Sequence, residues 1–228
     1  MYTQTKEIQE SLLPADAMRI LREGNARFAA NQKANRNLLQ QVDETRSGQF
    51  PFAVILSCID SRTSAELIFD QGLGDIFSIR IAGNILNGDI LGSLEFACHV
   101  AGAKLIVVLG HSRCGAIKGA CDGVQLGHLT GLLQQITPAV ESIAAPLDSA
   151  LRNSANEEFV EAVAAENVRR MVAAIPDRSS ILKEMKAAGA IDVVGGFYDV
   201  SSGTVDFLTK GSSVVDPRAG DRDLLVSA

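Results

Sequence analysis

Short runs of apolar residues alternate with amphipathic stretches along most of the chain. A continuous apolar run of about four to eight residues fits a strand covered on both faces, whereas apolar residues spaced three or four apart fit a helix with one buried side. The predicted strands are residues 52–57, 76–82 and 104–110, followed by two strands within residues 191–208. A turn at Ser202-Gly203 separates the last two, which can pair only antiparallel.

Helical spacing is found before, between and after these strands. The first predicted helix covers residues 16–30, with Met18, Leu21 and Phe28 on its apolar side and Asp16 as a candidate cap. The other predicted helices are residues 63–71, residues 89–102 ending at Gly102, and a long region from about Cys114 to about Ala188 with interruptions near Pro138, Pro146 and Pro176.

Strands that alternate with helices predict an α/β fold. We expect a mostly parallel central sheet with one antiparallel edge strand and helices on both faces. An N-terminal helical arm is expected at residues 1–35, and the polar residues 31–49 are expected to lead irregularly into the core. No repeat, low-complexity tract or linker divides residues 1–228, so we expect one domain with a C-terminal tail at residues 216–228.

Composition narrows the class of protein. A formal net charge of -6 and a pI near 5.1 argue against nucleic-acid binding, and no apolar run is long enough for a membrane span. The first residues lack the basic and apolar segments of a secretory signal, so the four cysteines are expected to be reduced thiols in a cytoplasmic protein.

Metal-binding side chains follow two of the predicted strands. Cys58 and Asp60 lie in "SCIDSR" after the first strand, and His111 and Cys114 lie in "LGHSRCGA" after the third. Because the carboxyl ends of parallel strands share one edge of a sheet, these four side chains can meet there. Thiolate, imidazole and carboxylate ligands suit tetrahedral Zn²⁺, and a helix beginning near Cys114 would favour its thiolate.

Other interpretations stay open at this point. A cysteine at a buried strand end can be a small hydrophobic residue, and a histidine there can be an ordinary buried polar group. Ser-Arg-Cys-Gly before a helix could bind phosphate, although it lacks the spacing of a P-loop. The remaining cysteines and histidines are interpreted as core or structural residues, namely Cys98, Cys121, His99 and His128.

The two segments resemble the signature motifs of the β-class carbonic anhydrases, as Cys58-Ile59-Asp60-Ser61-Arg62 and His111-Ser112-Arg113-Cys114-Gly115. The resemblance continues through residues 65–84, 91–97 and 193–205 and covers roughly residues 17–210. It implies reversible hydration of carbon dioxide to bicarbonate and a proton. It also implies one Zn²⁺ per subunit on Cys58, His111 and Cys114, with water or Asp60 as fourth ligand, and a homodimer or homotetramer whose arm wraps the partner.

The same resemblance gives Asp60 and Arg62 a catalytic role. Side chains two residues apart point the same way in an extended segment, so the guanidinium could hold the carboxylate ionised and off the metal. Asp60 would then accept a hydrogen bond from the attacking hydroxide. Related bacterial enzymes that close their zinc site carry a tryptophan where this chain has Ile55, and the chain contains no tryptophan. We therefore predict the open form near neutral pH.

Five residues match substrate-pocket positions of the family. Gln49 would donate its amide to a substrate oxygen, and the N–H of Gly115 would donate to bicarbonate. Phe77 and Ala82 would form apolar walls that face the neighbouring subunit's zinc. Phe96 stands where a tyrosine is usual, so one hydrogen bond in that pocket is expected to be missing.

Three alternative functions fit parts of the sequence. A carbon disulfide or carbonyl sulfide hydrolase on this scaffold would have the same zinc ligands. A non-catalytic zinc or bicarbonate-sensing module would not need the orienting residues Asp60, Arg62 and Gln49. A nucleotide-binding protein is disfavoured because the chain lacks the glycine fingerprint.

Overall fold

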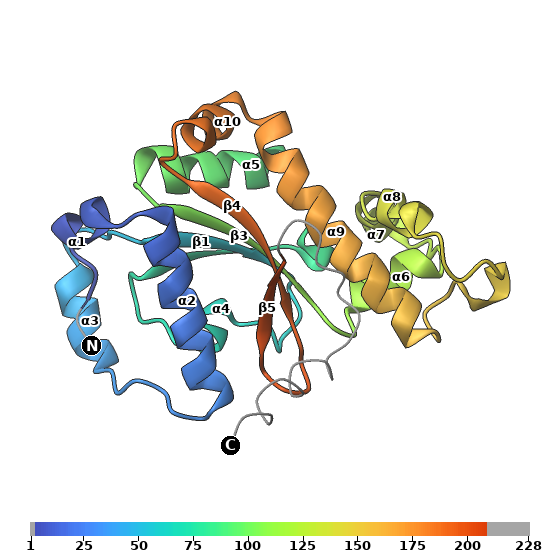
Figure 1. Ribbon diagram of the computed structural model, residues 1–228, viewed down its shortest axis with the longest axis horizontal. Coiled ribbons are helices and arrows are strands. Elements are labelled where there is room, and N and C mark those ends of the chain that lie inside the picture. The colour runs from blue at the N-terminus through green and yellow to red at the C-terminus, as the bar shows by residue number, and fades with distance from the viewer. Residues whose placement is uncertain (1–2, 209–228) are drawn as a thin grey trace, which may run out of the picture.

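The computed structural model describes residues 3–208, which form one five-stranded sheet with helices on both faces (Figure 1). The strand order is β2-β1-β3-β4-β5, and only the β4–β5 pair is antiparallel. This arrangement confirms the predicted α/β fold. The strands are β1 (Ala53–Ser57), β2 (Ile76–Arg80), β3 (Leu105–His111), β4 (Asp192–Tyr198) and β5 (Val205–Leu208).

The helices divide between the two faces and the carboxyl-terminal edge of the sheet. Their bounds are α1 (Lys6–Ser11), α2 (Pro14–Ala29), α3 (Leu38–Thr45), α4 (Ala65–Ile68), α5 (Gly88–Glu95), α6 (Gly115–Cys121), α7 (Gly127–Gln134), α8 (Thr137–Ser142), α9 (Glu157–Arg178) and α10 (Ser180–Ala187), with short turns η1 (Ala82–Asn84), η2 (Phe96–Val100) and η3 (Ser149–Leu151). Helices α5, α9 and α10 pack on one face, and α2 and α4 on the other. Helices α6 to α8 lie together beyond the sheet edge (Figure 1).

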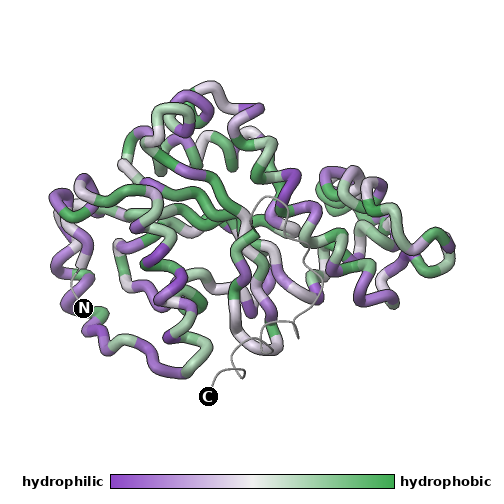
Figure 2. Tube along the Cα trace, viewed as in Figure 1, coloured by the Kyte–Doolittle hydropathy of each residue, from purple (hydrophilic) through white to green (hydrophobic). Residues whose placement is uncertain are grey.

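Two apolar clusters sandwich the sheet. Leu56 of β1 packs toward Val168 of α9, whereas its neighbour Ile55 packs toward Leu21 of α2. Because alternate side chains of β1 enter opposite clusters, all five of its residues are buried. The hydropathy of the trace follows this arrangement, with hydrophobic central strands inside mixed helices (Figure 2).

The N-terminal region differs in detail from the prediction. Helix α2 begins at Pro14, and Asp16 lies in its first turn, where its carboxylate accepts a hydrogen bond from the N–H of Leu13 at 3.1 Å. The expectation that Asp16 caps this helix directly was therefore wrong. The expectation of an irregular connection at residues 31–49 was also wrong in part. This segment contains the short helix α3, which the side chain of Asn37 caps. Leu21 of α2 is fully buried against the sheet of its own chain.

Other predicted helices are shorter or continuous. The helix expected at residues 63–71 is reduced to α4, and the one at residues 89–102 becomes α5 followed by a π-helical turn at η2. Pro176 does not interrupt α9, because it lies within the last turn of a helix that ends at Arg178.

No helix among residues 3–208 is long and apolar enough to cross a bilayer. The tail predicted at residues 216–228 lies outside the described residues.

Candidate metal centre

The metal-binding side chains meet at the carboxyl edge of the sheet. Strands β1 and β3 are parallel neighbours with Ser57 beside Leu109, so the residues that follow both strands emerge together. One ligand atom from each of Cys58, His111 and Cys114 lies within 4.8 Å of the others, and all three side chains are buried. His111 is the last residue of β3 rather than part of the following loop.

The donor set fits a zinc ion. The two sulfur atoms are 3.9 Å apart, and two ligands at about 2.3 Å from a tetrahedral zinc are separated by about 3.8 Å. His111 Nδ1 lies 2.9 Å from the carbonyl oxygen of Ser112, which can only accept, so Nδ1 carries the proton. Its Nε2 is buried and has no partner among the described residues. A neutral imidazole with this orientation is the form that binds zinc.

The two thiol groups shift each other's pKa across their 3.9 Å contact. A hydrogen bond from the Cys114 thiol lowers the pKa of Cys58 although burial acts against it, and the N–H of Gly83, 3.4 Å from Cys58 Sγ, acts in the same lowering direction. The Cys58 sulfur and burial raise the pKa of Cys114, although the amides of Ala116 and Ile117 oppose this. The pair therefore holds one thiolate beside one thiol, and zinc binding would release the remaining proton.

A sharp turn connects His111 to Cys114. Arg113 has a φ of 56°, in the left-handed region, and Cys114 then forms the N-cap of α6. This confirms that a helix begins at Cys114. The turn directs the imidazole and the second sulfur to the same space although only two residues separate them.

Asp60 is paired with Arg62 outside the three-residue cluster. Arg62 donates from Nε to Oδ1 at 2.9 Å and from Nη2 to Oδ2 at 2.8 Å, and its backbone N–H donates to Oδ1 at 3.0 Å. These contacts hold the pKa of Asp60 well below its usual range, although burial acts to raise it. The carboxylate is thus ionised and oriented beside the metal ligands.

Two positioning residues were missed by the sequence analysis. Gly83 in η1 has a φ of 67° and donates to the Cys58 sulfur, and its carbonyl accepts from the side chain of Asn167 at 2.9 Å. Asn167 is fully buried on α9. The available signal was an amide on the apolar side of a helix, because a buried amide requires partners.

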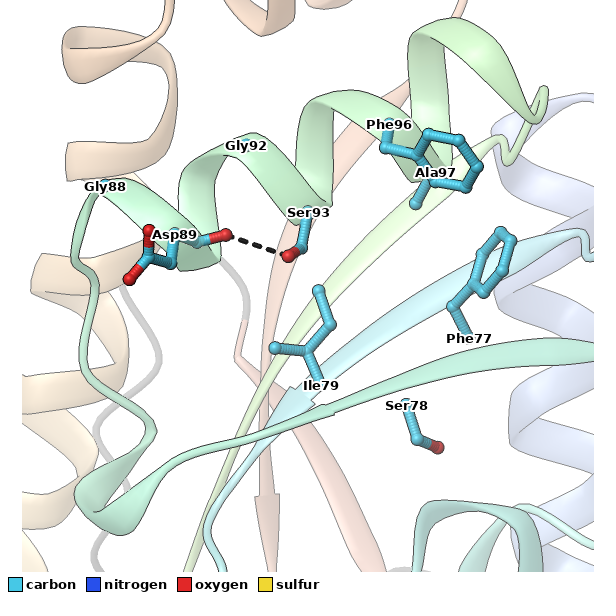
Figure 3. A pocket seen from close by; sticks show the side chains of 9 residues that line it. All are labelled: Phe77, Ser78, Ile79, Gly88, Asp89, Gly92, Ser93, Phe96 and Ala97. Atoms are coloured by element: carbon cyan, nitrogen blue, oxygen red, sulfur yellow. Dashed lines mark hydrogen bonds between the residues drawn. The ribbon is translucent and has the colours of Figure 1, made fainter.

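The five predicted pocket residues do not line a single hollow in this chain. Phe77 of β2 and Phe96 of η2 meet edge to face, with centroids 6.3 Å apart, and line a hollow of about 490 Å³ (Figure 3). Ala82 and Gly115 do not line it. Ala82 precedes Gly83, whose N–H donates to the Cys58 sulfur, and Gly115 follows Cys114 of the cluster. Gln49 is exposed between α3 and β1.

The remaining cysteines stay apart from the centre. Burial raises the pKa of Cys98 to about 12 and that of Cys121 to about 11, so both are inert thiols near neutral pH. The potential metal cluster found among the described residues contains neither of them, nor His99 or His128.

Comparison with known proteins agrees with this geometry. Residues 53–205 match the family model described as carbonic anhydrase. Carbonic anhydrase 2 of Mycobacterium tuberculosis is 38% identical over 195 residues, covering 83% of this chain and 90% of the relative. The carbonic anhydrase of Mycolicibacterium smegmatis is 35% identical over 199 residues, covering 85% and 92%.

A solved structure extends the match to the fold. The β-carbonic anhydrase CafA of Aspergillus fumigatus superimposes with a TM-score of 0.67 at 27% identity, covering 87% of this chain and 92% of that one. The resemblance drawn from the two motifs is confirmed by the family model, the curated relatives and this structure. The chain belongs to the β-class carbonic anhydrase family, whose zinc enzymes interconvert carbon dioxide and bicarbonate.

Proposed function

We propose that Cys58, His111 and Cys114 hold the catalytic Zn²⁺ and that Asp60 and Arg62 orient the attacking group during carbon dioxide hydration. The observation that carries this proposal is the two-bond pair between Asp60 and Arg62 beside a buried Cys-His-Cys set. A purely structural zinc site does not require an oriented carboxylate next to its ligands.

The protein's groups divide the chemistry among them. When bound, Zn²⁺ makes hydroxide available near neutral pH by lowering the pKa of a coordinated water molecule. Two thiolates and one neutral imidazole balance its charge. Ionised Asp60 can only accept hydrogen bonds. It would accept one from the attacking hydroxide and so orient a lone pair of the hydroxide oxygen toward the substrate. Arg62 keeps this carboxylate ionised and fixes its plane.

We also propose that the centre is open near neutral pH. The two bonds to Arg62 engage both oxygens of Asp60, and this would leave the fourth metal position to water. A crystal structure of the zinc protein near pH 7 tests this, and direct bonding of Asp60 to zinc would contradict it.

The apolar hollow suits a substrate without a net dipole. Phe77 and Phe96 would form its walls, and Phe77 and Ala82 would face the neighbouring subunit's zinc. The first-turn N–H of Gly115 would donate to bicarbonate, as free amides at a helix start favour anions. Gln49 would donate its side-chain amide to a substrate oxygen. Phe96 has no hydroxyl and offers no hydrogen bond.

A homo-oligomer, at least a dimer, is the expected assembly. Phe96 is 53% exposed and Val100 69% exposed, next to the edge strand β2. The helices at the N-terminus add further exposed apolar side chains, namely Leu13, Leu38, Leu39 and Val42. Apolar side chains that a monomer would leave in water fit surfaces that a partner covers.

Stopped-flow hydration assays test the proposed roles. The isosteric Asp60→Asn variant should keep one zinc per chain yet lose at least about tenfold in kcat, because an amide donates where the carboxylate accepts. Asp43→Asn is the matched control, since Asp43 pairs with Arg46 at 3.1 Å in a highly exposed ion pair. Unchanged kcat in Asp60→Asn would contradict the orienting role. Assays with carbonyl sulfide and carbon disulfide separate the hydrolase alternative.

A further inference from the structure

Two backbone carbonyl groups beside the metal centre are each bound by the same two side chains. The Thr63 hydroxyl lies 3.0 Å from the Cys58 oxygen and 2.8 Å from the Asp60 oxygen, so its single proton is shared between them. Arg80 donates from Nε to the Cys58 oxygen at 3.0 Å and from Nη2 to the Asp60 oxygen at 2.6 Å. Thr63 and Arg80 thus clamp the same two peptide groups.

The clamp follows from the register of the sheet. Arg80 is the last residue of β2 and lies beside Ser57, the last residue of β1, and the N–H of Ile81 donates to the Ser57 carbonyl at 3.0 Å. The guanidinium therefore needs to reach across only the next few residues of the neighbouring chain segment. Thr63 is buried at the far end of that segment. Arg80 thus binds the loop from the end of a strand, and Thr63 binds it from the protein interior.

The clamped segment has little other backbone support. Residues 58–62 leave the sheet after β1, and Ile59 within them is 61% exposed. The loop's own bonds include those from the Thr63 N–H to the Asp60 carbonyl and from the Arg62 N–H to the Asp60 carboxylate, both at 3.0 Å. Yet this loop carries both a metal ligand and the orienting carboxylate. Its shape therefore depends heavily on side chains that bind its carbonyl groups.

We propose that Arg80 and Thr63 are positioning residues that hold the loop so that the Cys58 sulfur and the Asp60 carboxylate face the same space. Neither side chain needs to touch the substrate. The inference rests on the role proposed above for Asp60. A shift of about 1 Å in a reacting group can cost on the order of a hundredfold in rate, so loss of the clamp should reduce turnover strongly.

The identity of Arg80 matters because its planar fork reaches two carbonyl groups at once. A lysine keeps the charge but offers a point donor on a flexible stem, and it cannot reproduce both bonds in the same geometry. Arg80 is itself exposed at an edge strand, so its replacement removes little buried surface. Catalysis should therefore respond more than stability does.

Arg80→Gln and Arg80→Lys test the guanidinium. Both variants should retain one zinc per chain and a melting temperature near that of the wild type. Their kcat should fall at least about tenfold with a smaller change in KM, and the absorption spectrum of the Co²⁺-substituted protein should change. The spectrum reports the ligand geometry without reference to turnover.

Arg152→Gln is the matched control for these variants. Arg152 also binds backbone carbonyl groups, donating to Ile143 at 2.7 Å, to Val140 at 2.8 Å and to Pro146 at 3.4 Å, but in a connection without proposed site residues. It should lower the melting temperature and leave kcat and the Co²⁺ spectrum unchanged.

Thr63→Val and Thr63→Ser test the hydroxyl. Valine keeps the shape and removes the donor, so it should lower kcat and alter the Co²⁺ spectrum, whereas serine keeps the donor and should restore both. Wild-type kcat and spectra in Arg80→Gln and Thr63→Val would overturn the proposal, as would a Thr63→Ser variant as impaired as Thr63→Val. Asp60→Asn with unchanged turnover would instead contradict the orienting role, and the Co²⁺ spectra would still report on the clamp.

Discussion

The sulfur atoms of Cys58 and Cys114 lie 3.9 Å apart although the two residues are 56 positions apart in the chain. One follows β1 and the other caps α6, so the pair joins two segments that leave different strands. All four cysteines are free thiols, so no disulfide links these segments. A metal bound to both sulfurs would therefore cross-link the two segments.

Removal of the metal is expected to lower stability. Chelation leaves a buried thiolate and an unpartnered imidazole nitrogen, and it removes a ligand that binds only the folded chain. A metal whose free concentration is about a hundred times its Kd adds about 2.7 kcal/mol to the free energy of unfolding. Its removal should therefore cause a clear fall in the melting temperature. Calorimetry with and without chelator, followed by addition of Zn²⁺, measures this change.

Cys114→Ser provides the control for chelation. A serine hydroxyl is a poor zinc ligand, so this variant should melt at a lower temperature and respond little to chelator. An equal response in both proteins would show that the stabilising metal binds elsewhere.

A Gly83→Ala substitution should weaken metal binding. The φ of 67° costs a non-glycine residue about 1–2 kcal/mol, and a new Cβ would lie 2.6 Å from Ile136 Cδ1. Relaxation of this turn would move the N–H that donates to the Cys58 sulfur. Competition with a coloured chelator should therefore report a lower Zn²⁺ affinity.

Gly189→Ala separates strain from metal contact. Gly189 has a φ of 71°, and an added Cβ there would meet nothing within 4 Å. In urea denaturation both variants should lose the stability that the left-handed φ costs, Gly83→Ala somewhat more because of its contact with buried Ile136, and only Gly83→Ala should lose affinity. A matching loss of affinity in Gly189→Ala would contradict the role of the Gly83 amide.

The sheet could be predicted because its strands are buried on both faces. The run Ala53–Ser57 sends alternate side chains into two apolar clusters, and that burial produces the continuous apolar pattern in the sequence. The ligands could be predicted because motif spacing and the shared edge of parallel strands bring them together. Asn37 gave a weaker signal, since one side-chain cap decides a short helix that has little buried surface.

The contacts of Arg80 and Asn167 could not be predicted. Arg80 reaches the loop only because the register pairs it with Ser57, and register is not visible in a single strand. Asn167 meets Gly83 because one turn of α9 crosses η1. Both relationships depend on tertiary packing between segments that are distant in the sequence.

Asp70→Asn is expected to destabilise the N-terminal region. The Asp70 carboxylate is buried and binds Arg27 Nε at 2.6 Å, Arg36 Nη1 at 2.5 Å and the N–H of Ala34 at 3.1 Å. Asparagine tolerates the left-handed φ of 46° but leaves the guanidinium groups without their charge partner. The loss should be about 3 kcal/mol at pH 7 by urea denaturation.

The pH dependence of this loss follows from the direction of the pKa shift. Burial raises the pKa of Asp70, but hydrogen bonds from Arg27 and Arg36 outweigh it and leave the pKa below its usual value. A lowered folded pKa gives a stabilisation that is complete above the unfolded value of about 3.9 and is lost as pH falls toward the folded value. The difference between wild type and Asp70→Asn should therefore shrink below about pH 4. A difference that grows with acid would contradict it.

Phe96→Glu should disrupt the expected homo-oligomer. Phe96 is half exposed against Phe77 at the edge of the sheet, where a partner would cover both rings. A glutamate there would place a charge in that interface, which costs several kcal/mol when it is left unpaired. Sedimentation equilibrium should show a smaller species than the wild type. Leu147→Glu is the control, because Leu147 is also exposed but lies in the connection after α8, far along the chain from β2 and η2. An unchanged mass in Phe96→Glu, or an equal loss in Leu147→Glu, would move the interface away from the hollow at Phe77.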